Sequence, residues 1–184
     1  MKIYKKNLEI LEKNNVYSKD MEHDACGVGL VASTEGKKSR EVVQYGIEAL
    51  KAVWHRGAVD ADGKTGDGAG IHIEIPKDFF IEKIEITGHK FENSEICVGM
   101  IFLPRNNFDA QEACRTIVES ELTKSNFSIY GWRQVPVNPK VLGEKADRTR
   151  PEITQVLFTH NNKSLNNKDL ERKLYETRRK IENV

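Results

Sequence analysis

The spacing of apolar residues predicts alternating strands and helices along most of the chain. A short apolar run at residues 27–32 ends in the turn-prone stretch 33–38, which is the pattern of a buried strand. Ser39 is a suitable N-cap, and apolar residues then recur every three or four positions as far as Trp54, as in an amphipathic helix. We therefore predict a strand followed by a helix that ends near residues 55–57.

Beyond this helix the pattern predicts further strands. A stretch rich in glycine and aspartate precedes residues 71–75, which alternate between apolar and polar positions until Pro76. Apolar or alternating segments follow at 96–103, 127–135 and 153–159. Each of these segments has the length and composition of a β-strand.

Two more helices are predicted in the second half of the chain. Asp109 and Glu112 have the spacing of a capping box, and the apolar positions after them continue to Leu122. Residues 167–184 form a highly charged stretch with a sparse apolar face. The alternation of strands and helices favours a layered α/β or α+β fold, but it does not give the order of the strands.

Composition and charge narrow the classes of function. The 29 Lys and Arg residues nearly balance the 28 Asp and Glu residues, so charge gives no argument for binding nucleic acid or an anionic membrane. Apolar runs are only a few residues long, far short of the roughly 20 needed to cross a bilayer. Residues 1–25 are polar and lack the apolar centre of a secretory signal. We expect a cytoplasmic protein.

The cysteines are the first candidates for chemistry. Cys26, Cys97 and Cys114 are odd in number and far apart, which suits a reduced compartment better than a disulfide scaffold, and their spacing matches no zinc site. Cys26 differs from the others because it lies between a polar segment and an apolar run opened by Gly27, where little bulk surrounds its side chain. A lone cysteine is more often a buried, unreactive residue, so its position alone does not identify Cys26 as a nucleophile.

Three short motifs supply that evidence. In chain order they are Asp24-Ala25-Cys26-Gly27-Val28-Gly29, His55-Arg56-Gly57-Ala58 and Gly66-Asp67-Gly68-Ala69-Gly70-Ile71. In these motifs the chain resembles the class II glutamine amidotransferases, and within them the glutamate synthases, from about Tyr17 to the region of Thr159. The resemblance implies an α+β fold, the four-layer αββα sandwich of N-terminal-nucleophile hydrolases, incomplete in this chain.

The resemblance also implies processing of the chain. Residues 1–25 would be a propeptide, and residues 26–184 would be the amino-terminal portion of the amidotransferase domain. Cleavage before Cys26 frees an α-amine, whose reference pKa of about 7.7–8.0 lets it take the thiol proton near neutral pH. Cys26 would then be both the nucleophile and the base in the attack on the amide of L-glutamine.

Other site residues also follow from the resemblance. Arg56 is implied to lie against the freed cysteine, with Gly27 as a supporting residue, whereas His55 is interpreted as structural because the α-amine already supplies a base. The glycines of the third motif predict a tight loop that packs close to the nucleophile strand. No metal ion is expected in the site.

Some parts of such an enzyme are not found in this chain. In the family an Asn-Gly pair of the oxyanion hole and the substrate-holding residues lie farther along the domain, and this sequence contains no Asn-Gly pair. We therefore expect a fragment that need not hydrolyse glutamine alone. The resemblance implies that the full-length enzyme carries FMN and an iron–sulfur cluster and uses 2-oxoglutarate as a substrate. It also implies two partners for this part of the chain, namely the rest of the synthase chain and a small electron-donating subunit. No cofactor is expected in this chain itself.

Two other interpretations stay open. The chain could belong to an N-terminal-nucleophile enzyme that hydrolyses a different amide, or be a non-catalytic remnant that only binds partner subunits, with the helix after Asn167 as the contact.

Two further motif matches in the sequence are rejected. A dinucleotide fingerprint at 27–32 is preceded by polar residues where a strand is required. A calcium loop beginning at Asp60 has Lys64 at a ligand position and Thr65 at the turn glycine.

Overall fold

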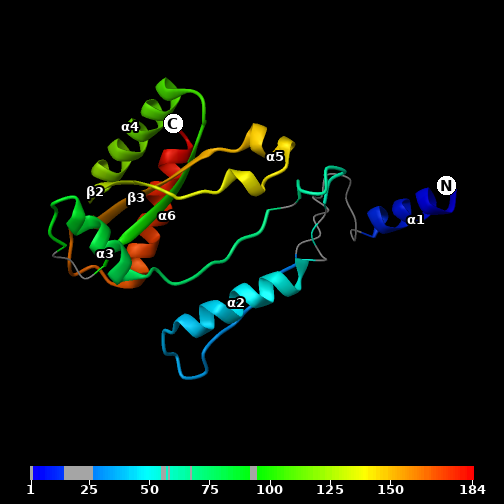
Figure 1. Ribbon diagram of the computed structural model, residues 1–184, viewed down its shortest axis with the longest axis horizontal. Helices are drawn as coiled ribbons and strands as arrows, with labels where there is room; N and C mark the ends of the chain where they lie inside the picture. The colour runs from blue at the N-terminus through cyan, green and yellow to red at the C-terminus, as the bar shows by residue number, and fades with distance from the viewer. Residues whose placement is uncertain (1, 15–26, 55–56, 58, 67, 92–94) are drawn as a thin grey trace. The chain divides into compact units, whose positions relative to one another are not determined.

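The computed structural model describes residues 2–14, 27–54, 57, 59–66, 68–91 and 95–184 (Figure 1). The chain divides into two compact units. The first contains residues 1–58 and 67–71, and the second contains residues 59–66 and 72–184. We describe each unit by itself.

The first unit contains two helices, α1 (Lys2–Lys13) and α2 (Arg40–Ala52). Helix α2 confirms the periodic pattern that predicted it. The Ser39 side chain accepts a hydrogen bond from the backbone N–H of Val42 at 3.2 Å, as an N-cap does. The N–H of Val53 bonds to the carbonyl of Ala49 and closes the last turn. The helix therefore ends just before the second motif.

Two predicted strands were wrong. Residues 27–32 and 71–75 take part in no strand ladder with the described residues. In the first of these segments Val28 and Leu30 are about 91% and 92% exposed. An apolar run marks a segment that a sheet could bury, but a strand also needs a neighbouring backbone to accept its hydrogen bonds. The pattern alone could not show that no such neighbour lies among the described residues.

The second unit is built on an antiparallel sheet. Its strands are β1 (Cys97–Leu103), β2 (Phe127–Gln134) and β3 (Glu152–His160), and their order is β1-β3-β2. All three strands were predicted, but their order was not. A register shift between Ile129 and Gly131 breaks the pairing of β2 with β3 locally.

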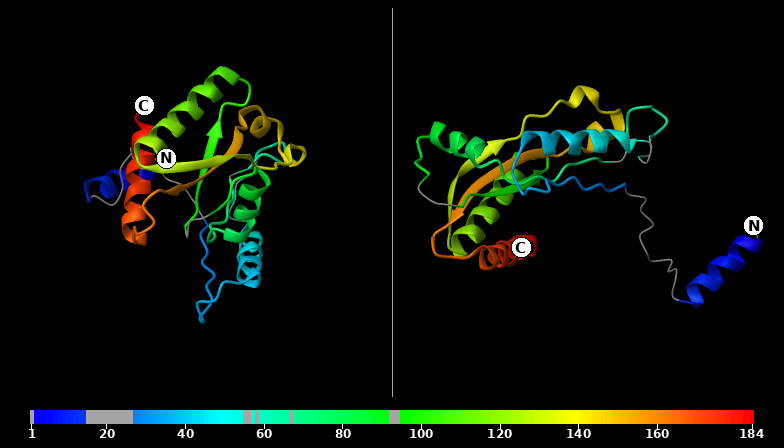
Figure 2. Two further views of the ribbon diagram at one scale, coloured as in Figure 1. Left: turned by 90° about the vertical axis from the view of Figure 1, so that its left-hand side faces the viewer. Right: turned by 90° about the horizontal axis from the view of Figure 1, so that it is seen from below.

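Helices cover both faces of the sheet. Helices α4 (Phe108–Lys124) and α6 (Asn167–Glu182) lie on one face, and α3 (Lys77–Ile86) lies on the other (Figure 2). A single turn η2 (Pro139–Val141) and the short helix α5 (Glu144–Thr149) connect β2 to β3. Helices on an antiparallel sheet confirm the α+β class.

The helix ends partly differ from the prediction. Asn107 caps α4, because its side-chain oxygen accepts the backbone N–H of Ala110 at 2.9 Å, so the predicted cap at Asp109 was two residues late. No helix was predicted at the position of α3. Its N-cap is Pro76, which makes no capping hydrogen bond from its side chain, so the usual start signal is absent there.

Two clusters of buried side chains fill the faces of the sheet. On the face of α4 and α6 the buried members are Cys97, Val118, Leu122, Phe127, Val156 and Phe158. On the face of α3 they are Phe80, Ile84, Ile96 and Leu157. Successive side chains of β3 pack in opposite clusters, so this central strand is buried on both faces. Within the described ranges, no helix combines the length and apolar character of a membrane span.

Cys97 belongs to the first cluster. Burial, followed by the nearby carboxylates of Glu171 and Glu95, raises the pKa of its thiol to about 12. Because the thiolate is the reactive form, this cysteine is a core residue with little reactivity near neutral pH.

We predict that Ile84→Ala and Ile86→Ala differ sharply in their effect on stability. Both residues lie in α3, but Ile84 is 1% exposed and Ile86 is 70% exposed. Ile84→Ala should lower the free energy of unfolding by about 2–5 kcal/mol, whereas the surface substitution should change it by less than about 0.5 kcal/mol. Denaturant unfolding followed by circular dichroism measures both values. Equal effects would contradict the packing of α3 on the sheet.

We also predict that Cys97 resists alkylation in the folded protein. Iodoacetamide at pH 8 should leave Cys97 unmodified, since its raised pKa keeps it a thiol and its burial blocks the reagent. Peptide mass spectrometry measures the modification, and the same reaction in denaturant is the control in which Cys97 should be labelled. Rapid labelling of Cys97 in the native protein would show that this cluster is not closed.

Candidate active site

The structure describes the surroundings of the predicted site more fully than the site itself. Cys26, His55 and Arg56 lie outside the described residues. Gly27 is described, and it is exposed at the start of an irregular segment. The roles predicted for these residues therefore stay predictions. The described residues on either side show how the second and third motifs are held.

Helix α2 leads directly into the second motif. After Val53, the backbone N–H of Gly57 donates to the carbonyl of Trp54 at 3.0 Å. The indole of Trp54 is largely exposed. In the sequence, only Val53 and Trp54 separate the end of the helix from the start of the motif.

The third motif ends against the same helix within the first unit. The side chain of Ile71 lies 3.2 Å from where a Cβ atom on Gly46 would stand, so glycine at this point of α2 permits the contact. The predicted close packing of the motif glycines is not seen among the described residues, because Gly68 and Gly70 have open space beside their Cα atoms. The close approach occurs at Gly46 instead.

A small hairpin, residues 59–66, joins the two motifs. Val59 and Gly66 form an antiparallel bridge, and the N–H of Asp60 donates to the carbonyl of Thr65 at 2.7 Å. The Asp62 carboxylate is occupied by hydrogen bonds within the hairpin. The described residues contain no group of three His, Cys, Asp or Glu side chains placed to hold a metal ion. The hairpin is thus a structural turn.

The other two cysteines do not compete with Cys26 for the role of nucleophile. Cys97 is buried in the core and its pKa is raised, which is the reverse of what activates a thiol. Cys114 lies on α4 and is partly buried. Neither belongs to the three motifs, and both are free thiols.

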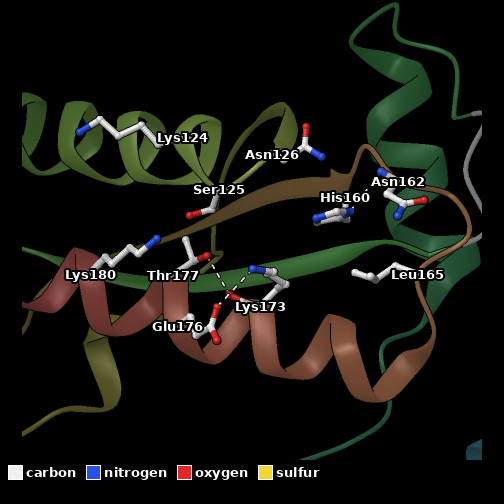
Figure 3. A pocket seen from close by; sticks show the side chains of 10 residues that line it. All are labelled: Lys124, Ser125, Asn126, His160, Asn162, Leu165, Lys173, Glu176, Thr177 and Lys180. Carbon is white, nitrogen blue, oxygen red and sulfur yellow. Dashed lines mark hydrogen bonds and ion pairs between the residues drawn. The ribbon is translucent and has the colours of Figure 1, made fainter.

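A groove of about 370 Å³ lies in the second unit, between the end of α4, the end of β3 and α6 (Figure 3). The residues that line it are Lys124, Ser125, Asn126, His160, Asn162, Leu165, Lys173, Glu176, Thr177 and Lys180. Three lysines and one glutamate make the groove basic.

Most polar groups of this groove are already engaged. Glu176 accepts hydrogen bonds from Arg172 at 2.9 Å and from Lys173 at 3.4 Å, and these bonds lower its pKa. His160 accepts the backbone N–H of Asn162 through Nδ1 at 3.1 Å. The buried hydroxyl of Ser125 has no hydrogen-bond partner among the described residues, so it is not activated by the histidine as in a Ser–His dyad. The groove holds no activated nucleophile.

Comparison with known proteins places the chain in a family. The family of class-II glutamine amidotransferases matches residues 26–184. The NADPH glutamate synthase large chain of Azospirillum brasilense is 54% identical over 179 residues, which is 97% of this chain and 12% of that protein.

Two further relatives have similar names. The ferredoxin-dependent glutamate synthase of Pyropia yezoensis is 37% identical over 94% of this chain and 11% of its own length. The NADPH glutamate synthase large chain of Bacillus subtilis is 33% identical over 91% of this chain and 11% of its own length. The chain thus spans about a tenth of the length of these relatives. With most of its residues matched, the chain belongs to the class-II glutamine amidotransferases, a family of enzymes.

Proposed function

We propose that this chain is the amino-terminal part of the glutaminase domain of a glutamate synthase, with Cys26 as the nucleophile. The observation that carries the proposal is the family match, which begins at residue 26 and continues to residue 184. Similarity to glutamate synthases of several organisms supports the choice within the family.

The same starting point supports a propeptide. Residues 1–25 precede the matched region, and Cys26 is its first residue. Before cleavage, the nitrogen of Cys26 is an amide, which is not basic. After cleavage between Ala25 and Cys26 it is an amine that can accept a proton near neutral pH. Removal of the propeptide is therefore the activation step.

The reaction proceeds through a covalent thioester. The α-amine of Cys26 takes the thiol proton, and the sulfur attacks the side-chain amide carbon of glutamine. The C–N bond of the tetrahedral adduct breaks, the amine returns its proton to the leaving nitrogen, and ammonia departs. Water then attacks the γ-glutamyl thioester by the same route, which releases glutamate and restores the cysteine.

Arg56 and Gly27 support this chemistry. The guanidinium of Arg56 is always charged, and beside the cysteine it would orient the residue and favour the thiolate. Gly27 leaves room around the nucleophile because it has no side chain. The two tetrahedral states also need an oxyanion hole, and each of its donors is worth about 10²- to 10³-fold in rate. We assign those donors to the part of the domain that follows this chain.

The second unit is suited to one half of a four-layer αββα sandwich. Helices α4 and α6 cover one face of the sheet, and α3 covers only part of the other face. On that second face Met100 and Phe102 of β1 are 47% and 64% exposed. Large apolar side chains in a row on a sheet are what a second sheet would bury.

The remaining parts of the synthase belong to the rest of the enzyme. We propose that ammonia released here serves glutamate synthesis from 2-oxoglutarate in a cytoplasmic enzyme, at a site with FMN and an iron–sulfur cluster. The names of the relatives include both NADPH-dependent and ferredoxin-dependent enzymes.

The first prediction from this proposal concerns processing. The purified full-length enzyme should have a mass that lacks residues 1–25, and a glutamine-like alkylating analogue should add one equivalent at Cys26. Intact-mass and peptide mass spectrometry measure both changes, and excess glutamine should slow the labelling. An unprocessed, unlabelled chain would favour a non-catalytic remnant. Labelling that glutamine does not slow would favour an enzyme for another amide.

The second prediction concerns the two sources of nitrogen. In the full-length enzyme, Cys26→Ser should abolish glutamine-dependent glutamate synthesis and leave ammonia-dependent synthesis intact, because only the first requires the thioester. Cys114→Ser is the matched control, since that cysteine lies outside the motifs, and it should retain both activities. An equal loss of both activities in Cys26→Ser would contradict the proposed role.

A further inference from the structure

The groove between α4, β3 and α6 is lined by two asparagines whose side-chain oxygens are already engaged. The oxygen of Asn126 accepts a hydrogen bond from the side-chain amide of Asn161 at 3.1 Å. The oxygen of Asn162 accepts the backbone N–H of Ser164 at 3.0 Å. The NH₂ groups of Asn126 and Asn162 donate no hydrogen bond within the described part of the chain. These two amides therefore offer mainly donors to a ligand.

His160 offers a donor for the same reason. Because its Nδ1 accepts the backbone N–H of Asn162 at 3.1 Å, the proton of the neutral ring is on Nε2. The ring packs edge-on against Phe127, with centroids 5.0 Å apart, and this contact restricts its orientation. The buried hydroxyl of Ser125 has no partner among the described residues, so its O–H is also available.

Two lysines of α6 bring positive charge to the groove. Lys180 makes no ion pair with any residue that the structure describes. Nζ of Lys173 lies 3.4 Å from one carboxylate oxygen of Glu176, and the other oxygen accepts a hydrogen bond from Arg172 at 2.9 Å. One carboxylate thus faces two cations and cannot cancel both charges. The groove therefore keeps a net positive charge.

The donors come from separate elements that meet at the groove (Figure 3). Lys173 and Lys180 extend from α6, and His160 lies at the end of β3. Seven residues of an α-helix rise by about 10.5 Å, so the two lysines are anchored two turns apart. The third lysine, Lys124, is already paired with Glu121 at 2.6 Å. Positive charge is therefore offered at two points along the groove.

We infer that this groove binds a small dianion with carboxylate or phosphate oxygens, held by Lys173, Lys180 and the Nε2–H of His160. An ionised oxyanion accepts several hydrogen bonds and donates none, which complements a groove whose acceptors are engaged and whose donors remain. The volume of about 370 Å³ suits a small molecule. Two separated lysines favour a ligand with two charges over one with a single charge. All of these residues belong to the second unit, so the inference does not depend on the proposed function.

The test is lysine acetylation of the full-length enzyme by acetic anhydride at pH 8, measured by peptide mass spectrometry. Glutarate is the dicarboxylate probe and inorganic phosphate is the phosphate probe, each compared with sodium chloride at equal ionic strength so that screening stays constant. A bound probe should slow the acetylation of Lys173 and Lys180 about tenfold at about ten times its Kd. Lys168 is the internal control, because it is exposed on α6 but does not line the groove, and its rate should not change.

Two variants test whether the lysines act together. Lys180→Gln should raise the Kd measured through the protection of Lys173 roughly tenfold, as expected for one lost charge-assisted hydrogen bond, whereas Lys168→Gln should leave that Kd unchanged. Protection by glutarate alone would support a dicarboxylate ligand, and protection by phosphate alone a phosphorylated one. The inference is wrong if neither probe protects Lys173 and Lys180, if Lys168 is slowed equally, or if Lys180→Gln leaves the Kd at Lys173 unchanged.

Discussion

The burial of β3 on both faces is the constraint on which the second unit depends. Val156 and Phe158 point to the cluster of α4 and α6, while Leu157 between them points to the cluster of α3. Because β3 also pairs with β1 and β2 along both edges, its backbone groups are satisfied only when the whole sheet is present. Strand and helices therefore form together, and a change in this strand affects every layer.

The proposed chemistry lies outside this packed unit, at loops and at a chain end. Such a site needs support from a rigid scaffold, because catalytic geometry tolerates little displacement. Within the second unit, a series of contacts runs from the sheet through α5 to the 59–66 hairpin.

The cysteines illustrate how environment decides reactivity. Cys97 has the same side chain as Cys26, but burial raises its pKa to about 12 and gives it a role in packing. The proposal for Cys26 depends on the opposite circumstances, namely a free α-amine and a neighbouring arginine. The free amine would exist only after the propeptide is removed. The leader would thus delay the chemistry until the chain is processed.

The features of this protein that depend on local patterns could be predicted from its amino-acid sequence. Periodicity and the Ser39 cap predicted α2, apolar runs predicted the three strands of the sheet, and the order of three motifs identified the family and the candidate nucleophile. These signals are readable because caps, amphipathic faces and motif residues act within a few positions of one another.

The pairing of segments that lie far apart in the chain became visible in the three-dimensional structure. It gave the order β1-β3-β2, left residues 27–32 and 71–75 without a ladder among the described residues, and placed Gly143 against the hairpin. It also assigned Cys97 to the core. Each of these outcomes depends on contacts between residues that are far apart in the chain. The free energy of such a contact cannot be inferred from the residues that surround either contacting residue in the sequence.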